Sequence, residues 1–269
     1  MSRQAIALPT FAFGMSKKSW IILGVVFWLY FVISHIPAVW GAWMLTRSGD
    51  VAMSGVTGTV WSGRASLTSV KFKNVNYSLG QVTWKLKIFS LLLLKPCAHI
   101  TSTADNQTFE GDVCSGFGNR LSMSDVTANF PAMMVQPLLP IGIEGQLSLQ
   151  MEDLDVQNNQ LSDLKAKVTW ENAKIYNGTN WMELGGFGAD LSDDDKKGLR
   201  AHIVDANSPV RVDVNAALLS PSGGSIKGSL TISEGFLHQT NSQAWLSMFA
   251  VPQPTDAQGN INYAVDLNL

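Results

Sequence analysis

The sequence predicts a mainly β protein that carries one membrane-spanning helix near its N-terminus. Two observations support this class. Residues Trp20 to Val39 form a nearly unbroken apolar run, and many short segments after Arg47 alternate strictly between apolar and polar residues. Signals for other helices are few. We therefore expect a single anchor followed by a large, curved antiparallel β-sheet domain of about a dozen strands, with a few short helices.

The apolar run is long enough to cross a bilayer, because about 20 residues at 1.5 Å each span a hydrocarbon core of roughly 30 Å. Lys17 and Lys18 precede it directly, with no acidic residue before them. Cations favour the cytoplasmic side, and Trp40 and Trp43 follow where an interfacial aromatic belt belongs. We expect these four residues at the membrane interface. The expected divisions are a cytoplasmic tail (1–18), the transmembrane anchor (19–40) and a periplasmic β-rich domain (47–269).

A cleaved signal peptide is the alternative interpretation of the apolar run. Signal peptides contain about 7–15 apolar residues and end in a small-x-small cleavage site. This run is longer and rich in aromatic residues, and the best cleavage candidate, Val39-Trp40-Gly41, fits that pattern poorly. The sequence therefore favours an uncleaved anchor.

Charge and motif content argue against several classes of function. The whole chain has formal charge −2, and after its first 46 residues it carries 16 Lys and Arg against 21 Asp and Glu. No basic surface for nucleic acid is expected from this balance. The four histidines lack metal-site spacing, and neither a nucleophile elbow nor a phosphate-binding loop occurs. We expect no enzymatic activity, no metal and no cofactor.

The chain contains two cysteines, Cys97 and Cys114. Both would lie in an oxidising compartment if the predicted topology is right. Their separation suits two neighbouring strands joined by a hairpin. We expect a Cys97–Cys114 disulfide, and two buried free thiols are the alternative.

Period-two segments predict strands, because alternation places one face of a strand in a core and the other in water. The clearest segments are 51–56, 58–63, 65–72, 81–88, 146–151, 210–214, 225–232 and 260–267. The last of them, Ile261 to Leu267, is a candidate free edge of the sheet. Short helices are expected at 89–95, 132–139 and 242–249.

A weak internal repeat suggests two similar halves, 50–140 and 141–269. The triplet Val-Thr-Trp occurs twice, ending at Trp84 and at Trp170, about 25 residues after a glycine in each case. Chance repetition in a β-rich chain is the alternative. Trp61, Trp84 and Trp170 either anchor the core or line a groove for lipid or peptide.

Several segments together resemble a known family. They are Gly58-Thr59-Val60-Trp61-Ser62-Gly63, Val82-Thr83-Trp84, Val168-Thr169-Trp170-Glu171-Asn172-Ala173 and Leu218-Leu219-Ser220-Pro221. In this order, after a single anchor, they resemble the general secretion pathway protein N family of the bacterial type II secretion system. The resemblance covers essentially the whole chain, and its most specific parts are the segment with Gly58, Thr59, Val60, Trp61 and Gly63 and the segment with Trp170 and Ala173; Trp84 also belongs to the family motif.

The resemblance implies a non-enzymatic, single-pass inner-membrane protein of a Gram-negative bacterium with a periplasmic β domain. Such proteins belong to the assembly that exports folded proteins through an outer-membrane secretin. The expected partners are other inner-membrane subunits, with the secretin as a further candidate. The curved β architecture is also similar to that of AsmA-type proteins, and this similarity implies lipid binding or transfer as the alternative function.

Overall fold

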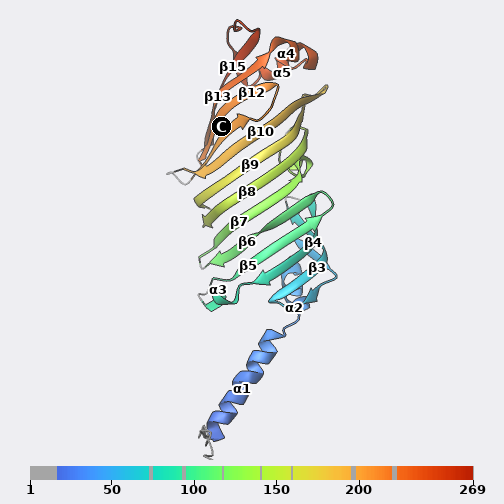
Figure 1. Cartoon of the computed structure of the whole chain (residues 1–269), viewed down its shortest axis with the longest axis vertical. Helices are drawn as coiled ribbons and strands as arrows, with labels where there is room; N and C mark the ends of the chain where they lie inside the picture. The colour runs from blue at the N-terminus through green and yellow to red at the C-terminus, as the bar shows by residue number, and fades with distance from the viewer. Residues whose placement is uncertain are drawn as a thin grey trace, which may run out of the picture.

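The computed structural model describes residues 17–72, 75–92, 95–116, 118–139, 141–158, 160–194, 198–219 and 223–268. In this part of the chain, one antiparallel sheet of 15 strands dominates the fold (Figure 1). Its strands are β1 (Val51–Ser54), β2 (Thr57–Gly58), β3 (Ser62–Phe72), β4 (Val75–Leu86), β5 (Cys97–Ala104), β6 (Gln107–Gly116), β7 (Arg120–Pro131), β8 (Ile143–Gln157), β9 (Gln160–Tyr176), β10 (Trp181–Asp193), β11 (Leu199–Asp205), β12 (Val210–Leu219), β13 (Gly223–Ser233), β14 (Ala250–Pro252) and β15 (Asn260–Asn268). The helices are α1 (Lys17–Ser34), α2 (Ala38–Thr46), α3 (Ile88–Leu92), α4 (Glu234–Thr240) and α5 (Gln243–Leu246), with the 3-10 turns η1 (Ala132–Met134) and η2 (Gln136–Leu138).

The sheet is an almost unbroken meander. From β3 to β13 every strand pairs with the next strand of the chain, and the order then runs β13, β15, β14. The sheet stays open, because β1 and β14 end this order without pairing to each other. The predicted fold class is therefore confirmed: one apolar N-terminal helix followed by a large, curved antiparallel sheet with a few short helices.

The prediction that residues 261–267 form a free edge is wrong for three of these seven residues. β14 pairs with β15 from Ala250↔Val265 to Pro252↔Tyr263 and so becomes the outermost strand. A three-residue strand that ends in proline was not visible as a period-two segment.

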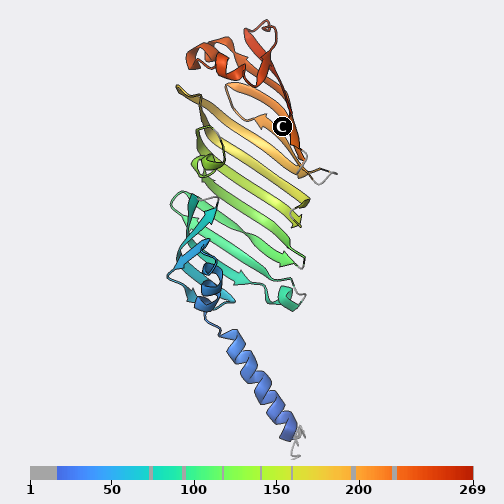
Figure 2. The ribbon, with the colours of Figure 1, turned by 180° about the vertical axis from the view of Figure 1, so that it is seen from behind.

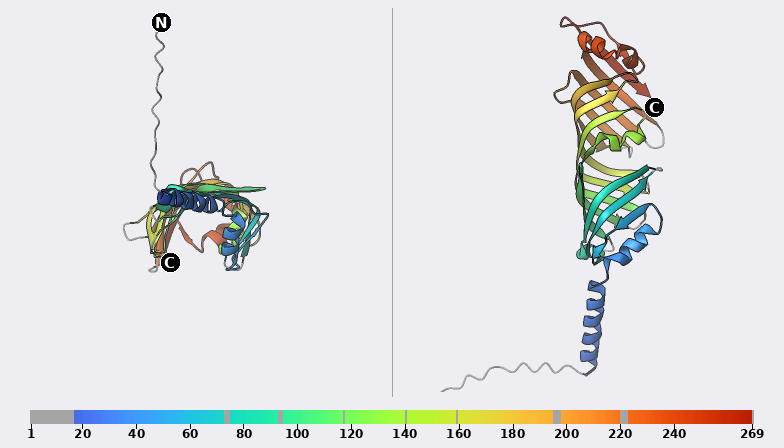
Figure 3. Two further views of the ribbon diagram at one scale, coloured as in Figure 1. Left: turned by 90° about the horizontal axis from the view of Figure 1, so that it is seen from below. Right: turned by 90° about the vertical axis from the view of Figure 1, so that its right-hand side faces the viewer.

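Seen along its long axis, the sheet curls into an open trough (Figure 3), and the view from behind shows the uninterrupted row of strands (Figure 2). Bulges accompany this curvature. The β6–β7 register shifts opposite Asp125, and the β8–β9 register shifts at Asn172. Both residues have positive φ, 52° and 50°. A bulge bends its strand and increases the local twist, so repeated bulges curl the sheet.

Helices cover the concave face near both ends of the trough. Near the far end, α4 and α5 place Leu237 and Leu246 in a buried cluster with Ile232, Tyr263 and Val265. At the end near the anchor, Ala38 and Ala42 of α2 are buried. Alternate residues of the strands supply the rest of this core, as period-two patterning requires.

The short helices match the sequence in part. The two 3-10 turns and α5 lie inside segments expected to be helical, and α3 overlaps the segment 89–95 but begins one residue earlier, at Ile88. Helix α4 was not predicted, because it has only seven residues and includes Gly235. Its ends carry ordinary helix signals: the Ser233 side chain accepts a hydrogen bond from the Phe236 N–H, and Asn241 adopts the left-handed conformation.

Helix α1 is long and apolar enough to cross a membrane, and none of its residues is buried in the protein. It ends at Ser34, six residues before the expected end of the anchor. After Pro37 the chain begins a second helix, α2. The assignment of residues 1–18, 19–40 and 47–269 to three compartments stays a prediction, as do the two similar halves.

The predicted disulfide is present. Cys97 and Cys114 are bonded to each other and lie directly opposite on β5 and β6, with their Cα atoms 4.0 Å apart. The hairpin expected from their spacing therefore exists, and the bond links its two open ends.

Candidate functional site

The end of helix α1 is hydrogen-bonded to the first loop of the sheet. The indole N–H of Trp61 donates to the carbonyl oxygen of Ile33 at 2.7 Å, although 28 residues separate the two. The backbone N–H of Val60 donates to the Ile36 carbonyl at 3.0 Å. The last carbonyls of a helix lack partners within the helix. This contact, called the anchor junction below, supplies such partners from the sheet.

The residues of the Gly-Thr-Val-Trp-x-Gly segment build this junction between them. Gly58 has φ +92° and starts a tight turn in which the Thr59 N–H donates to the Ser62 carbonyl at 2.9 Å. Val60 and Trp61 extend from this turn toward α1. A Cβ on Gly63 would lie 2.4 Å from the Trp84 ring, so only glycine leaves room for that ring.

Trp84, on strand β4, stabilises the same turn. Its indole N–H donates to the Val60 carbonyl at 3.0 Å. The side chains of Trp84 and Val60 also line an apolar cavity of about 260 Å³ beneath α2, where Ala38, Gly41 and Ala42 face the sheet. Three small residues let helix and sheet approach closely, so α2 and the turn pack as one unit.

The second Val-Thr-Trp triplet repeats this arrangement far from the anchor. The indole N–H of Trp170 donates to the Glu144 carbonyl at 3.0 Å. A Cβ on Gly145 would lie 2.6 Å from the Glu171 carbonyl oxygen and 2.8 Å from the Trp170 ring nitrogen, and Gly145 has φ +118°. Ala173 is fully buried. Trp170 and Ala173 therefore fix the β8–β9 pair and do not reach the anchor junction.

Two of the three tryptophans fit the roles considered for them, and Trp61 fits neither. Trp84 and Trp170 are partly buried on the concave face, and Trp170 lines an apolar cavity of about 380 Å³ under α4 and α5. Trp61 is neither a core nor a groove residue, because its ring serves the end of α1. Sequence patterning could not reveal this contact, since it depends on how the helix and the sheet meet.

The expected membrane-interface residues occupy two separate places. Lys17 and Lys18 begin α1 at the end distant from the sheet. Trp40 and Trp43 are exposed on α2, and the Arg47 guanidinium lies 5.4 Å from the centre of the Trp43 ring. Their contact with lipid stays a prediction.

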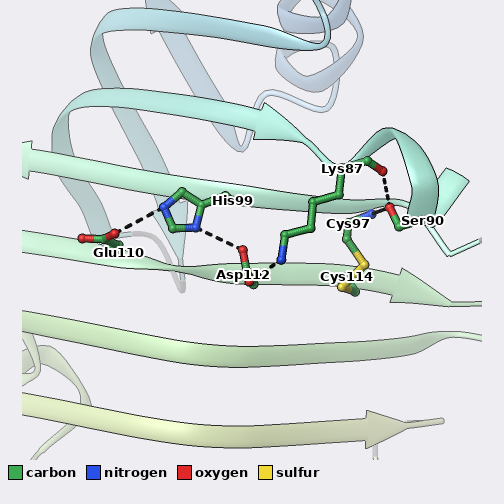
Figure 4. A network of polar contacts seen from close by, with 7 residues as sticks. All are labelled: Lys87, Ser90, Cys97, His99, Glu110, Asp112 and Cys114. Carbon is green, nitrogen blue, oxygen red and sulfur yellow. Dashed lines mark hydrogen bonds and ion pairs between the residues drawn. A yellow bond between two sulfur atoms is a disulfide. The ribbon is translucent and has the colours of Figure 1, made fainter.

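A polar cluster that sequence patterning missed surrounds the disulfide (Figure 4). Lys87 Nζ lies 2.5 Å from an Asp112 carboxylate oxygen, and His99 Nδ1 lies 3.0 Å from the other oxygen. The second ring nitrogen of His99 lies 3.3 Å from Glu110. Cross-strand pairing of β5 with β6 brings these residues together. No group of three or more His, Cys, Asp and Glu among the described residues is arranged to hold a metal ion.

The Asp112 carboxylate is ionised more readily than usual. Burial alone would raise its pKa, but the hydrogen bonds and positive charges of Lys87 and His99 outweigh burial and lower the pKa below 3.8. A pKa lowered by folding stabilises the folded state above the ordinary pKa, and this stabilisation is lost as the pH falls through the folded-state pKa.

These features define a class of protein: an open β trough whose first turn is hydrogen-bonded to a helix long enough to cross a membrane. The sequence of the trough identifies it further. Residues 49–262 match the family described as Type II secretion system (T2SS), protein N. The chain belongs to this family and is therefore a component of type II protein secretion.

The chain is similar to the Type II secretion system protein N of Vibrio cholerae serotype O1 (strain ATCC 39315 / El Tor Inaba N16961). The two are 24 % identical over 160 residues, which are 57 % of this chain and 62 % of that relative. The match thus spans less than two thirds of the relative's length. No solved structure is significantly similar to this chain.

Replacing Trp61 by Phe should loosen the anchor junction. The variant keeps an aromatic ring but loses the N–H that bonds Ile33, a loss of about 1 kcal/mol. In the full chain in lipid nanodiscs, hydrogen exchange at the Val60 amide should become about fivefold faster. Trp170→Phe is the matched control, because it removes the same kind of bond at Glu144 and should leave Val60 unchanged. Equal exchange in both variants would contradict the junction.

Replacing Asp112 by Asn should lower the free energy of unfolding at pH 7 by about 1–3 kcal/mol, because charged hydrogen bonds are lost. It should also flatten the fall in stability of the wild type below about pH 4. Chemical denaturation of the full chain in detergent across this pH range measures both effects. Asp105→Asn, at the exposed β5–β6 turn, is the control that should keep the wild-type slope.

Proposed function

We propose that this chain is a non-enzymatic inner-membrane subunit of the type II secretion system. It helps folded proteins leave the periplasm by contacting other proteins of the assembly. The observation that carries this proposal is the anchor junction. The segment most specific to the family holds the membrane helix against the sheet through Trp61 and Val60, and none of its contacts resembles a catalytic arrangement.

The proposed location is the inner membrane, with the N-terminus in the cytoplasm and the sheet in the periplasm. The cations Lys17 and Lys18 begin α1, and no acidic residue occurs in that helix. Positively charged flanks favour the cytoplasmic side. A periplasmic sheet also agrees with the Cys97–Cys114 disulfide, since disulfides form and persist there.

The proposed partners are other inner-membrane subunits, with the secretin as a further candidate, and the contacts would use the open edges of the sheet. β14 and β1 end the strand order, and unpaired backbone groups on such edges can accept a strand from another protein. Fourteen strands lie in one path, and at about 4.8 Å per spacing the sheet extends roughly 60 Å. That reach would place β14 well away from the membrane.

Lipid transfer was the alternative implied by the trough shape. The apolar cavity under α4 and α5 is compatible with it. Membership of the protein N family favours secretion over this alternative. The two roles differ in the phenotype of a deletion, because lost lipid transfer should make the outer membrane leaky without trapping exoproteins.

The proposed topology predicts that alkaline phosphatase fused after residue 269 is active, because this enzyme matures only in the oxidising periplasm. A fusion after residue 16, on the cytoplasmic side of α1, is the matched control and should be inactive. Phosphatase activity in intact cells measures both. An active enzyme after residue 16 or an inactive one after residue 269 would reverse the orientation.

Deleting the gene should trap folded exoproteins in the periplasm and leave the outer membrane tight. Expression of the full chain should restore release, measured as exoprotein activity in the medium against the periplasm. Among complementing variants, Val251→Lys should restore less than the wild type, because lysine on the exposed edge strand β14 opposes strand addition.

Val204→Lys is the control for that variant, since it makes the same change on the interior strand β11. It should complement fully. Normal release from the deletion strain together with a leaky outer membrane would reject the secretion role in favour of lipid handling. Equal complementation by the two variants would reject the β14 edge as the contact.

A further inference from the structure

The loop between β4 and β5 displays apolar side chains at the surface. Its described residues after Lys87 begin with Ile88-Phe89-Ser90-Leu91, which are apolar except for Ser90. Phe89 is 83 % exposed and Ile88 is 61 % exposed, and Phe89 is the most exposed large hydrophobic side chain in the described part of the chain. Such exposure is costly in water unless another apolar phase covers it.

The loop is held firmly at its base (Figure 4). The Ser90 hydroxyl donates to the Lys87 carbonyl and accepts from the Cys97 N–H at 3.1 Å. The Lys87 N–H donates to the Cys97 carbonyl at 2.8 Å, and the Lys95 N–H donates to the Ser90 carbonyl at 3.0 Å. These bonds make α3 a fixed projection of the sheet.

The disulfide and the ion pair add covalent and charged bonds to this base. Cys97, which bonds Ser90, is itself tied to Cys114 on β6. Lys87, at the start of the loop, forms an ion pair with Asp112, which lies on β6 together with Cys114. Four hydrogen bonds, the disulfide and the ion pair therefore hold this exposed apolar turn in place, with Phe89 pointing away from the protein.

The loop lies at the end of the sheet from which α1 leaves. Figures 1 and 2 both show α3 and α2 on opposite sides of this end, with α1 extending beyond them. The carbonyl of Ile33, bonded to Trp61, marks where the helix meets the sheet. A bilayer crossed by α1 would therefore lie below both α2 and α3.

We propose that the α3 loop is a second membrane contact, which inserts Phe89 and Ile88 among the lipids of the leaflet next to the sheet. Trp40 and Trp43 of α2, on the opposite side of the anchor end of the sheet, would form the first contact, so the trough would touch the membrane at two points. This inference rests on the proposed membrane anchorage of α1 and is independent of the role in secretion.

The charges around the loop favour lipid as its occupant. Lys85, Lys87 and Lys95 flank the loop in the sequence, and no acidic residue lies between Lys87 and Lys95. Aromatic and aliphatic side chains at the acyl boundary, with lysines at the headgroup level, are the pattern of an interfacial membrane segment. Lysines near the surface also attract anionic lipids.

The test is site-specific photocrosslinking of the full chain in nanodiscs of phosphatidylethanolamine and phosphatidylglycerol. A photoreactive phenylalanine replaces Phe89, Trp40 or Met248 in separate samples, and intact mass measures the lipid adducts. Met248 is the control, because it is also highly exposed, at 73 %, but lies on the loop after α5, near the far end of the trough. The lipid adduct at residue 89 should be about tenfold more abundant than at residue 248 and comparable to that at residue 40.

Further variants test whether the bonds at the base of the loop hold Phe89 in the lipid. Replacing Cys97 and Cys114 together by Ser, or Ser90 by Ala, should reduce the lipid adduct at residue 89 and leave that at residue 40 unchanged. Adducts at residue 40 without any at residue 89 would overturn the proposal. So would a protein-sized adduct at residue 89 in cells, because a partner protein would then cover the loop. Lipid adducts at neither position would instead reject the membrane anchorage itself.

Discussion

Helix α1 ends in carbonyl groups that need hydrogen-bond donors, and the rest of this structure depends on which groups supply those donors. His35 and Ser34 satisfy the Phe31 carbonyl from within the helix end. The Ile33 and Ile36 carbonyls are satisfied by Trp61 and Val60 of the sheet. Because these donors belong to the first turn of a continuous sheet, the position of every later strand is set relative to the anchor.

Beyond that turn, backbone pairing between successive strands fixes the position of each strand relative to the one before it. Each strand from β3 to β13 pairs with its successor, so no strand can rotate independently of its neighbours. Bulges at Asp125 and Asn172 bend the ladder without interrupting it. Helices then cover the concave face near both ends, while the edges stay open. The result is a long, stiff element with apolar surface inside and unpaired backbone at its limits.

The strands were predictable where the alternation is unbroken. Residues 146–151, 210–214, 225–232 and 260–267 all lie within observed strands. β7 was missed because the bulge at Asp125 separates Met123 from Val126 by three residues instead of two, which breaks the period. β6 was missed in part because Gly111, which faces Val126, has no side chain to mark the buried face.

The site was predictable as a motif but not as a contact. Gly58, Trp61, Gly63 and Trp84 stand out by residue type, and their roles in one turn follow from cross-strand pairing. The target of Trp61 does not follow, because the sequence gives no register between a helix end and a loop 28 residues later. The same limit hid Asp112, whose partners lie on another strand and in the loop before it.

The two cysteines illustrate how one local feature can serve placement as well as stability. A disulfide across neighbouring strands closes a loop of about 16 residues, worth about 3 kcal/mol in the chain-entropy model. The hairpin is already paired over eight positions with hydrogen-bonded neighbours on both sides. The bond sits instead at the open end of the hairpin, beside Ser90 and Lys87, where the chain leaves the ladder to form the α3 loop. Position therefore argues that the disulfide matters most for the loop that it supports.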